Sequence, residues 1–409
     1  MKIRNLSITE FQEFIRNNKY GSFRQTLDYA LLKSEYGYEY EIIGYCNGED
    51  IYAAALVLVK LLDGYLYAYI PSGFIADYDN TRLIQDFTED LYNYYKKEDV
   101  IFIKINPPIP IAEIDNKKYS KKYNKNYHIV STLKECGFEK TKDSKNFETM
   151  LPTINAIVDL DYYDEENLNK NTKNKIRKAV RKGLSLEIGN MANIDILNEF
   201  VKKKINRSDF YYSDYYSIFK KSNSIDYFLV SIDYEKLIIN SQEAYNKETR
   251  KNNKLNEKIA FRPKNKTINV KMNSDRALES YKNDIVLATK KINNTEKEYI
   301  AGALVVHFGD TATIIISGYD KKYGIYSPNY FLYNEICKYY KNEVKYLDLN
   351  GLTADFSKEN KYHGLNNFKL GFKPKIYEYI GEYDLVINQR VYNHLGKKGL
   401  LEKEIKNSK

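Results

Sequence analysis

The chain contains few cysteines and histidines. Its three cysteines, Cys46, Cys136 and Cys337, are odd in number, lie far apart and include no CxxC pair. They therefore support neither a disulfide framework nor a zinc ribbon, and a reducing cytosol fits this pattern best. The four histidines are not spaced as metal ligands, so we expect neither a metal nor another cofactor.

Long hydrophobic runs are also missing. Residues 1–18 mix charged and apolar side chains and lack the apolar segment of a signal peptide. The longest apolar stretch, residues 51–62, is interrupted by Lys60 and is well short of the roughly 20 residues that span a bilayer. The sequence thus predicts a cytoplasmic protein, either soluble or peripheral at the inner face of the membrane.

Several common catalytic motifs are absent. The chain has no GxxxxGK(S/T), HExxH, GxSxG or GxGxxG, which removes the most frequent ATPase, zinc peptidase, hydrolase and dinucleotide-binding signatures. It also lacks the (R/Q)xxGx(G/A) loop that would hold the pyrophosphate of coenzyme A on backbone amides. An acetyl-CoA enzyme is therefore disfavoured.

What the chain does contain is a large core and concentrated positive charge. Its 409 residues are 43% hydrophobic, with 41 Tyr and 18 Phe, so two or three globular domains are expected. The net charge of +9 is concentrated in residues 117–125, with five lysines, and residues 170–182, with seven basic residues. Such patches favour phosphate-rich partners. A solvated helix face or a flexible lysine loop is the alternative.

Helix and strand patterns alternate and predict an α/β protein with two similar mixed-sheet units in tandem. In the first unit we expect helices at residues 9–17, 25–36 and 80–96, and strands at 40–45, 51–59, 65–70 and 100–105. In the second we expect a basic helix at residues 167–182, a helix at 328–341, and strands at 157–160, 184–188, 300–308, 311–318 and 346–349.

Residues 233–298 have a different composition, rich in Lys, Asn and Glu and poor in core residues. Leu278, Ile285 and Ile292 recur every seven residues, beside a seam of Tyr281 and Ala288. The segment before the break at residues 262–265 offers Leu237, Ala244, Leu255 and Ile259. We predict an antiparallel helical-hairpin (coiled-coil) arm. A disordered, lysine-rich insertion is the alternative.

Seven segments follow one another along nearly the whole chain: SFRQTLDYALLKSEYG (22–37), YAYIPSGFIADYDN (67–80), FIKINPPIP (102–110), IRKAVRKGLSLEIG (176–189), INRSDFYYSDYY (205–216), YLDLNGL (346–352) and NNFKLGFKPKIYEYIGEYDLVIN (366–388). Taken together and in this order, they resemble the FemABX family of aminoacyl-tRNA-dependent transferases, which build peptide bridges on peptidoglycan precursors. The resemblance implies two tandem GNAT-like domains, residues 1–152 with 381–409 returning to them, and residues 153–380 with the arm at 233–298.

The chemistry implied is aminolysis of an ester. A stem-peptide amine of lipid II or of UDP-MurNAc-pentapeptide attacks the aminoacyl carbonyl, a tetrahedral oxyanion forms, and the tRNA 3′-hydroxyl leaves. This needs positioning, a cation or donor at the oxyanion, and proton transfer from the amine. Lys369, in the FKLGF string, matches the family lysine implicated in stabilising the oxyanion.

Other positions match the family's acceptor site. Lys33 and Arg207 match phosphate-contacting positions, with Tyr211 as a hydrogen-bonding neighbour, and Tyr212 or Tyr215 as alternatives to it. Asn106 stands where the family usually has aspartate. A carboxamide accepts a hydrogen bond from the amine but cannot take its proton, so a base role at this position is excluded.

For the tRNA, the candidates are the basic helix with Lys175, Arg177, Lys178, Arg181 and Lys182, and the tip of the arm. The alternative is that both patches face anionic lipid at the inner leaflet of the membrane. Two rival functions follow from the same residues. One is an aminoacyltransferase of the same fold that acts on another amine. The other is a non-catalytic module that binds tRNA or a membrane surface, for which Asn106 is the sequence support.

Overall fold

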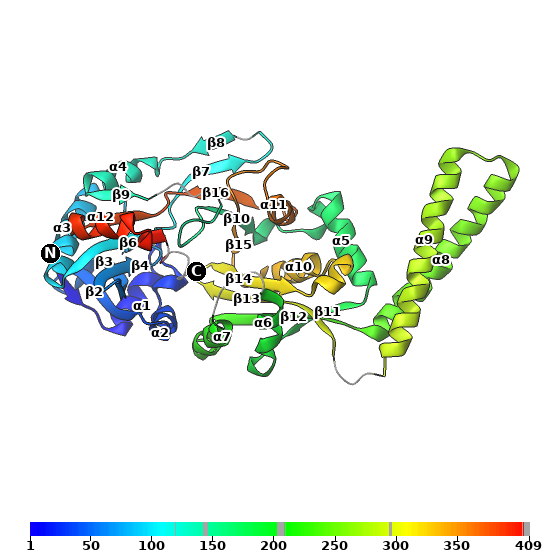
Figure 1. Ribbon diagram of the computed structural model, residues 1–409, viewed down its shortest axis with the longest axis horizontal. Coiled ribbons are helices and arrows are strands. Elements are labelled where there is room, and N and C mark those ends of the chain that lie inside the picture. The colour runs from blue at the N-terminus through cyan, green and yellow to red at the C-terminus, as the bar shows by residue number, and fades with distance from the viewer. Residues whose placement is uncertain are drawn as a thin grey trace.

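The computed structural model describes residues 1–118, 120–141, 146–202, 208, 210–293, 297–402 and 404. These residues form two mixed β-sheets with helices packed on them, and a long helical hairpin extends from the second sheet (Figure 1). The prediction of a mixed α/β protein is confirmed.

The first sheet has eight strands in the order β1-β2-β3-β4-β6-β17-β9, with β5 paired to β3. Only β4 and β6 pair in parallel among its described strands, and this parallel pair brings their carboxyl ends to one edge. The strands are β1 (Lys2–Asn5), β2 (Glu39–Asn47), β3 (Asp50–Leu62), β4 (Tyr65–Ile70), β5 (Ile75–Ala76), β6 (Val100–Ile105), β9 (Phe138–Lys140) and β17 (Tyr383–Val386).

Among the described residues, five helices accompany this sheet, and each has buried apolar side chains. The first begins with a capping box, in which Ser7 accepts from the amide of Glu10 and the Glu10 carboxylate accepts from the amide of Ser7. The helices are α1 (Ile8–Arg16), α2 (Leu27–Ser34), α3 (Thr81–Lys97), α4 (Tyr127–Glu135) and α12 (Gln389–Lys397).

The second sheet has nine strands in the order β11-β12-β13-β14-β15-β10-β16-β7-β8, with β14 and β15 parallel. Its strands are β7 (Pro110–Asp115), β8 (Ser120–Tyr123), β10 (Ile154–Asp159), β11 (Leu184–Ile188), β12 (Ile225–Ile232), β13 (Tyr299–Phe308), β14 (Thr311–Tyr319), β15 (Tyr346–Gly351) and β16 (Lys375–Tyr379). Its helices are α5 (Lys170–Arg181), α6 (Ile194–Val201), α7 (Tyr211–Lys221), α10 (Pro328–Tyr340) and α11 (His363–Leu370).

The chain exchanges strands between the two sheets. Strand β17 lies between β6 and β9 of the first sheet, although it comes after every strand of the second. Conversely, β7 and β8 join the edge of the second sheet through β16. The domain boundaries at residues 152 and 380 stay a prediction.

Both faces of the second sheet are covered, because successive side chains of β12 enter two different hydrophobic cores. Tyr227 and Leu229 belong to a hydrophobic core that includes α6 and α7 and continues into the first sheet. Phe228 and Val230 point into a second core that contains residues of α5 and α10. The two sheets therefore share one continuous core through α6 and α7, which fixes the sheets relative to each other.

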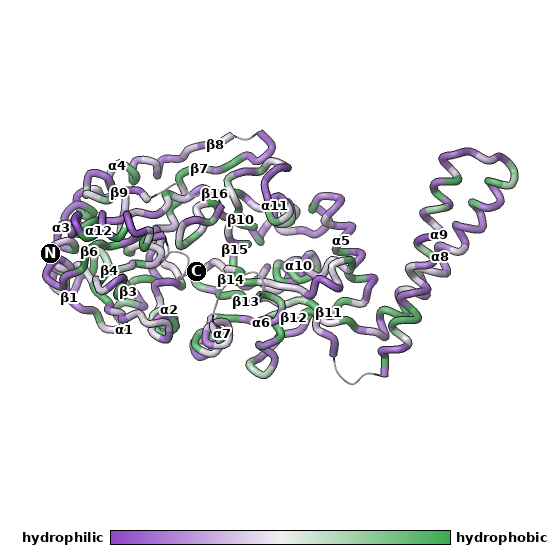
Figure 2. The backbone as a smooth tube through the Cα atoms, in the orientation of Figure 1, coloured by the Kyte–Doolittle hydropathy of each residue, from purple (hydrophilic) through white to green (hydrophobic). Residues whose placement is uncertain are grey.

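The arm consists of α8 (Tyr234–Phe261) and α9 (Asn265–Lys291), which lie side by side and run in opposite directions (Figure 1). Most of the arm is hydrophilic, in contrast to the strands of both sheets (Figure 2). Its buried interior is partly polar, because Asn252 donates to the Ser274 hydroxyl at 3.1 Å and to the Asp275 carboxylate at 2.7 Å. The heptad residues Leu278 and Ile285 are only half-buried, and a supercoiled pairing stays a prediction.

Candidate active site between the two sheets

Two adjoining cavities lie where the two sheets meet. The larger has a volume of about 760 Å³ and the smaller about 270 Å³. Arg24, Leu151, Pro152 and Asn350 line both. Some lining residues come shortly after β4 or β6, and others lie in the connection that leads to β10. The cavities thus combine loops of the first unit with strand ends of the second.

Asn106 lines the larger cavity just after β6. Its Oδ1 accepts the Ser72 amide at 2.8 Å, and its Nδ2 donates to the Tyr69 hydroxyl at 2.9 Å. Ser72 and Gly73 have φ angles of 61° and 70°, and a Cβ on Gly73 would lie 2.6 Å from Pro107. Asn106 therefore stabilises the tight turn after β4, and both ends of its amide are already engaged.

Lys33 and the two candidate tyrosines line the smaller cavity together. The Lys33 ammonium is buried on α2 and lies 5.5 Å from the ring centre of Tyr29 and 6.0 Å from that of Tyr211. Tyr211 and Tyr215 are on α7, with ring centres 5.9 Å apart. Burial raises the pKa of Tyr215 well above its usual value, so its hydroxyl stays a hydrogen-bond donor.

The cavity is held at the contact between α2 and α7. Just after α2, Tyr36 donates a hydrogen bond of 2.7 Å to Asp214, and Ser222 donates one of 2.5 Å to Asp28. Because α2 packs on the first sheet and α7 on the second, these bonds fix Lys33 opposite Tyr211. The structure therefore brings together three of the residues predicted to bind the acceptor.

Lys369 lies behind the cavity wall, on α11. Its side chain is buried, and its Nζ donates a hydrogen bond of 2.6 Å to the Gly351 carbonyl. Burial lowers the pKa of this ammonium to about 8, although the Asp348 carboxylate opposes the shift. An ammonium has three N–H donors, and the described contacts use one of them.

Asp348 links Lys369 to the larger cavity, which it lines from β15. Its carboxylate accepts from the Asn155 side chain at 2.9 Å and from the Asn350 amide at 2.7 Å. Burial raises its pKa despite these bonds and the nearby cations Arg24 and Lys369. It therefore supports the positive φ of Asn350, 68°, at the end of the strand.

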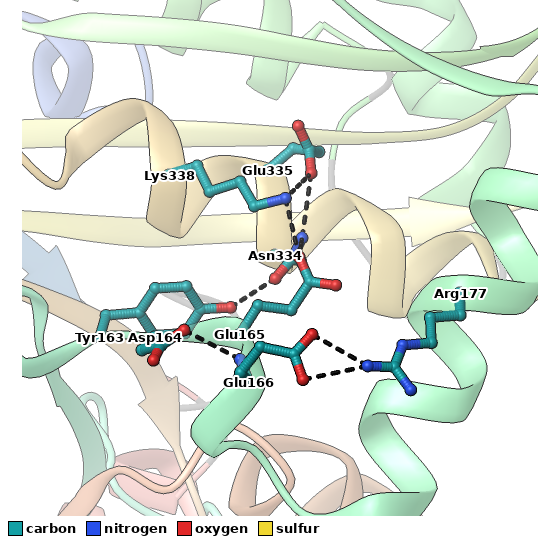
Figure 3. A network of polar contacts seen from close by, with 8 residues as sticks. All are labelled: Tyr163, Asp164, Glu165, Glu166, Arg177, Asn334, Glu335 and Lys338. Carbon is teal, nitrogen blue, oxygen red and sulfur yellow. Dashed lines mark hydrogen bonds and ion pairs between the residues drawn. The ribbon is translucent and has the colours of Figure 1, made fainter.

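The cations of α5 contact other parts of the protein. Lys175 donates to the Tyr330 hydroxyl at 3.0 Å, and Arg177 reaches the Glu166 carboxylate at 2.9 Å (Figure 3). Arg181 bonds the Tyr281 hydroxyl, and the buried Lys182 pairs with Asp284 on α9. The end of α5 thus anchors the base of the arm.

Lys178 lies at the same junction. It lines a cavity of about 150 Å³ between α5, α8 and α9. Burial lowers the pKa of this lysine, and the neighbouring Lys182 and Arg181 lower it further. None of the five α5 cations lines either cavity between the sheets, so the predicted tRNA residues and the predicted acceptor residues form separate groups.

Arg207, predicted to contact phosphate, lies outside the described residues. Conversely, Arg24 lines both cavities, although it was not among the predicted site residues. A single arginine between Phe23 and Gln25 carries no sequence signal of its own, and only the tertiary fold reveals its position. Within the described ranges, no helix is long and apolar enough to cross a bilayer, and no three His, Cys, Asp or Glu side chains converge as metal ligands.

The arrangement is that of an α/β protein with two mixed sheets and two adjoining cavities where the sheets meet. The crystal structure of FemX has this fold, with a TM-score of 0.74 and 19% sequence identity, over 97% of this chain and 100% of that one.

The chain belongs to the FemAB family, whose model matches residues 6–396. The resemblance inferred from the motifs is thereby confirmed. A relative from Staphylococcus aureus strain MRSA252, 24% identical over 96% of this chain and 94% of its own, is a lipid II:glycine glycyltransferase. Another, from S. aureus strain bovine RF122 / ET3-1, is the aminoacyltransferase FemA, 24% identical over 96% of this chain and 97% of its own.

Proposed function

We propose that this protein transfers an amino acid from aminoacyl-tRNA to the stem-peptide amine of a peptidoglycan precursor, either lipid II or UDP-MurNAc-pentapeptide. The observation that carries the proposal is family membership over nearly the whole chain, together with relatives named as glycyl- and aminoacyltransferases. Under this proposal residues 1–152 with 381–409 form one GNAT-like domain and residues 153–380 form the other. The protein works in the cytoplasm or at the inner face of the membrane.

The cleft between the sheets is the proposed site of transfer. The acceptor amine attacks the ester carbonyl, the carbonyl oxygen becomes an oxyanion, and the bond to the tRNA oxygen then breaks. Lys369 is proposed to stabilise the oxyanion with one of its remaining N–H groups. Its hydrogen bond to the carbonyl of Gly351, the residue that follows the cavity-lining Asn350, supports this role. Asn106 is proposed to accept a hydrogen bond from the amine, and the proton leaves to substrate or water.

The smaller cavity is proposed to hold the acceptor. Lys33 contributes positive charge, while Tyr211 and Tyr215 contribute hydroxyl groups and ring faces. Arg207 is proposed as a further phosphate contact by its match to the family motif. The packing of α7 supports this assignment, because the Tyr211 ring lies beside the Lys33 ammonium and the Tyr215 ring lies next to that of Tyr211.

The tRNA is proposed to bind the basic face of α5 and the tip of the arm. The start of α5 packs closely against the end of α11, the helix that carries Lys369. A Cβ on Gly371, just after α11, would lie only 2.5 Å from the Thr172 hydroxyl in the first turn of α5. This contact supports a connection between the proposed tRNA surface and the active site. Helix α5 thus extends from the Lys369 helix to the arm. Lys182 contributes mainly by fixing the arm, since its ammonium is buried against Asp284.

The test is mass spectrometry of a reaction that contains the purified protein, a pool of aminoacylated tRNA, and either soluble UDP-MurNAc-pentapeptide or lipid II. We expect a mass gain of one amino-acid residue on an acceptor, and its loss after treatment with RNase. No gain on either acceptor would overturn the proposal. With tRNA binding intact, that outcome would favour a different amine or a non-catalytic role.

A further inference from the structure

The first basic patch of the sequence lies at the outer edge of the second sheet. Residues 116–134 contain no Asp or Glu, and five lysines fall within residues 117–125. Strand β8 is the last strand of that sheet, and all four of its residues are exposed. Figure 1 shows it on the outer side of the molecule. The five lysines, together with Tyr123 and Tyr127, form the β8 patch, which the proposed function leaves unassigned.

Most of the charge in the β8 patch is not neutralised by carboxylates. Lys121 pairs with Glu378 at 2.8 Å, and Lys118 lies 3.9 Å from Asp115. Three more lysines are exposed and have no carboxylate within ion-pair distance among the described residues: Lys117, Lys122 and Lys125. Exposed positive charge of this density attracts an anionic surface.

Two tyrosines give the β8 patch an amphipathic character. The side chain of Tyr123 is 56% exposed and that of Tyr127 is 52% exposed, and their rings form an edge-to-face pair with centres 5.3 Å apart. A tyrosine has an apolar ring and a polar hydroxyl, which suits it to the headgroup level of a bilayer. Lysines beside such rings supply the attraction to anionic headgroups.

The β8 patch is fixed to a strand that reaches the larger cavity. The side-chain amides of Asn124 and Asn126 both donate to the Pro110 carbonyl, at 2.8 and 2.9 Å, and Pro110 of β7 lines that cavity. The opposite edge of the sheet is β11, which contacts α5, the helix at the base of the arm. The β8 patch and the proposed tRNA surface therefore lie at opposite edges of one sheet, which leaves each free for its own partner.

We propose that the β8 patch docks the protein on an anionic lipid bilayer. Single-stranded nucleic acid is usually bound in a groove that follows its backbone, but none of the three cavities described above is lined by the β8 patch. An exposed strand edge with lysines and tyrosines fits a flat membrane surface better. Docking there favours lipid II over UDP-MurNAc-pentapeptide as the acceptor, and this last consequence rests on the proposed function.

Co-sedimentation with vesicles tests the docking without any transfer reaction. The full chain is mixed with vesicles of equal parts phosphatidylglycerol and phosphatidylcholine, or of phosphatidylcholine alone, and we expect it to bind the anionic vesicles. The β8 triple variant, Lys117→Ala with Lys122→Ala and Lys125→Ala, should bind them about a hundredfold more weakly, since each lysine near an anionic surface strengthens binding about fivefold.

The matched control removes three exposed charges from α3, by Arg82→Ala, Lys96→Ala and Lys97→Ala, and should bind the anionic vesicles nearly as the wild-type chain does. The tyrosines have a separate readout. Tyr123→Ser with Tyr127→Ser should weaken binding, and this loss should persist at about 1 M salt, which shortens the Debye length to about 3 Å and screens the lysines.

The inference is overturned if the wild-type chain does not bind the anionic vesicles, or if the β8 triple variant binds them equally well while circular dichroism shows an intact fold. A loss of vesicle binding on removal of Lys173, Arg177 and Lys178 alone assigns the membrane surface to α5 and overturns it too. A loss of tRNA binding in the β8 triple variant, with vesicle binding unchanged, assigns the patch to RNA instead.

Transfer assays separate this inference from the proposed function. If both hold, the β8 triple variant turns over UDP-MurNAc-pentapeptide as the wild type does but uses lipid II in anionic vesicles poorly. Equal use of lipid II in vesicles by the variant and the wild type rejects the docking alone. Vesicle binding that depends on the β8 patch, without turnover of either acceptor, rejects the proposed function alone.

Discussion

Lys369 carries its charge where burial opposes it, and its pKa of about 8 makes its role testable by pH. If the ammonium stabilises the oxyanion, we expect kcat to fall as the pH rises through about 8, because the lysine then loses its proton. Lys369→Met should remove this fall and lower kcat by about 10²–10³, the usual loss for one oxyanion donor. Single-turnover rates between pH 6.5 and 9.5 measure both effects.

The control for Lys369 is Lys373→Met, which removes an exposed lysine shortly after α11 and should leave the profile unchanged. A rate that rises through pH 8 would instead assign Lys369 as a base.

The pH dependence of stability gives an independent check on the pKa of Lys369. The folded pKa lies below the unfolded value of about 10.4, so the unfolded chain binds more protons between the two values. The free energy of unfolding should therefore rise with pH in that window, and less so in Lys369→Met.

Asn106 also affects stability through its two hydrogen bonds. Asn106→Ala leaves the buried Ser72 amide without an acceptor, and we expect the free energy of unfolding to fall by about 1–3 kcal/mol. Asn106→Asp keeps an acceptor at this position and should lose less. Urea unfolding of both variants measures the difference. Equal stability of Asn106→Ala and the wild type would show that the turn after β4 holds without this side chain.

At the scale of elements, a buried ion cluster fixes β17 against β6. The Lys104 ammonium lies 2.7 Å from Asp384 and 3.0 Å from Glu382. Burial opposes the charge on Lys104, but these carboxylates outweigh burial and raise its pKa. Lys104→Met leaves two buried carboxylates without a counter-charge, so we expect a loss of about 3–5 kcal/mol in the free energy of unfolding.

The matched control for this loss is Lys121→Met. Lys121 forms an ion pair of 2.8 Å with Glu378 between β8 and β16, but it is 43% exposed. Surface pairs of this kind contribute about 0–1 kcal/mol, so the control should unfold at nearly the urea concentration of the wild type. A similar loss in both variants would mean that burial does not determine the strength of the Lys104 cluster.

Helix α5 is the element on which tRNA binding depends in the proposed function. We expect the triple variant Lys173→Ala, Arg177→Ala, Lys178→Ala to bind aminoacyl-tRNA more weakly and with a shallower salt dependence, because fewer counter-ions are released. Filter binding at several salt concentrations measures this. The control replaces Arg82, Lys96 and Lys97 of α3, which removes three charges from the first unit. Equal affinity of both triple variants would reject α5 as the RNA surface.

At the scale of the whole molecule, locally periodic elements could be predicted from the sequence. The strands at residues 65–70 and 100–105 have the predicted bounds, and the helix predicted at residues 80–96 is α3, Thr81–Lys97. The exchange of β7 and β8 into the second sheet was not predicted. Pairing between distant strands depends on tertiary packing, and a sequence pattern records only which residues alternate.

The candidate site shows the same limit. Motif matching selected Lys33, Asn106, Tyr211 and Tyr215, and the structure places all four in the lining of the two cavities. Their roles stay predictions. Arg24 was not selected because its significance is spatial: it lines both cavities, a position that no local spacing encodes.

The position of β17 has a consequence for synthesis on the ribosome. Strand β6 ends at Ile105, but its neighbour β17 begins at Tyr383. The edge of β6 and the Lys104 charge therefore remain uncovered while residues 106–382 are translated. Exposed strand edges and unsatisfied charges are sites where nascent chains misassociate. The first unit can thus close only after β17 has been translated, and a nascent chain truncated before β17 should depend on chaperones to stay soluble.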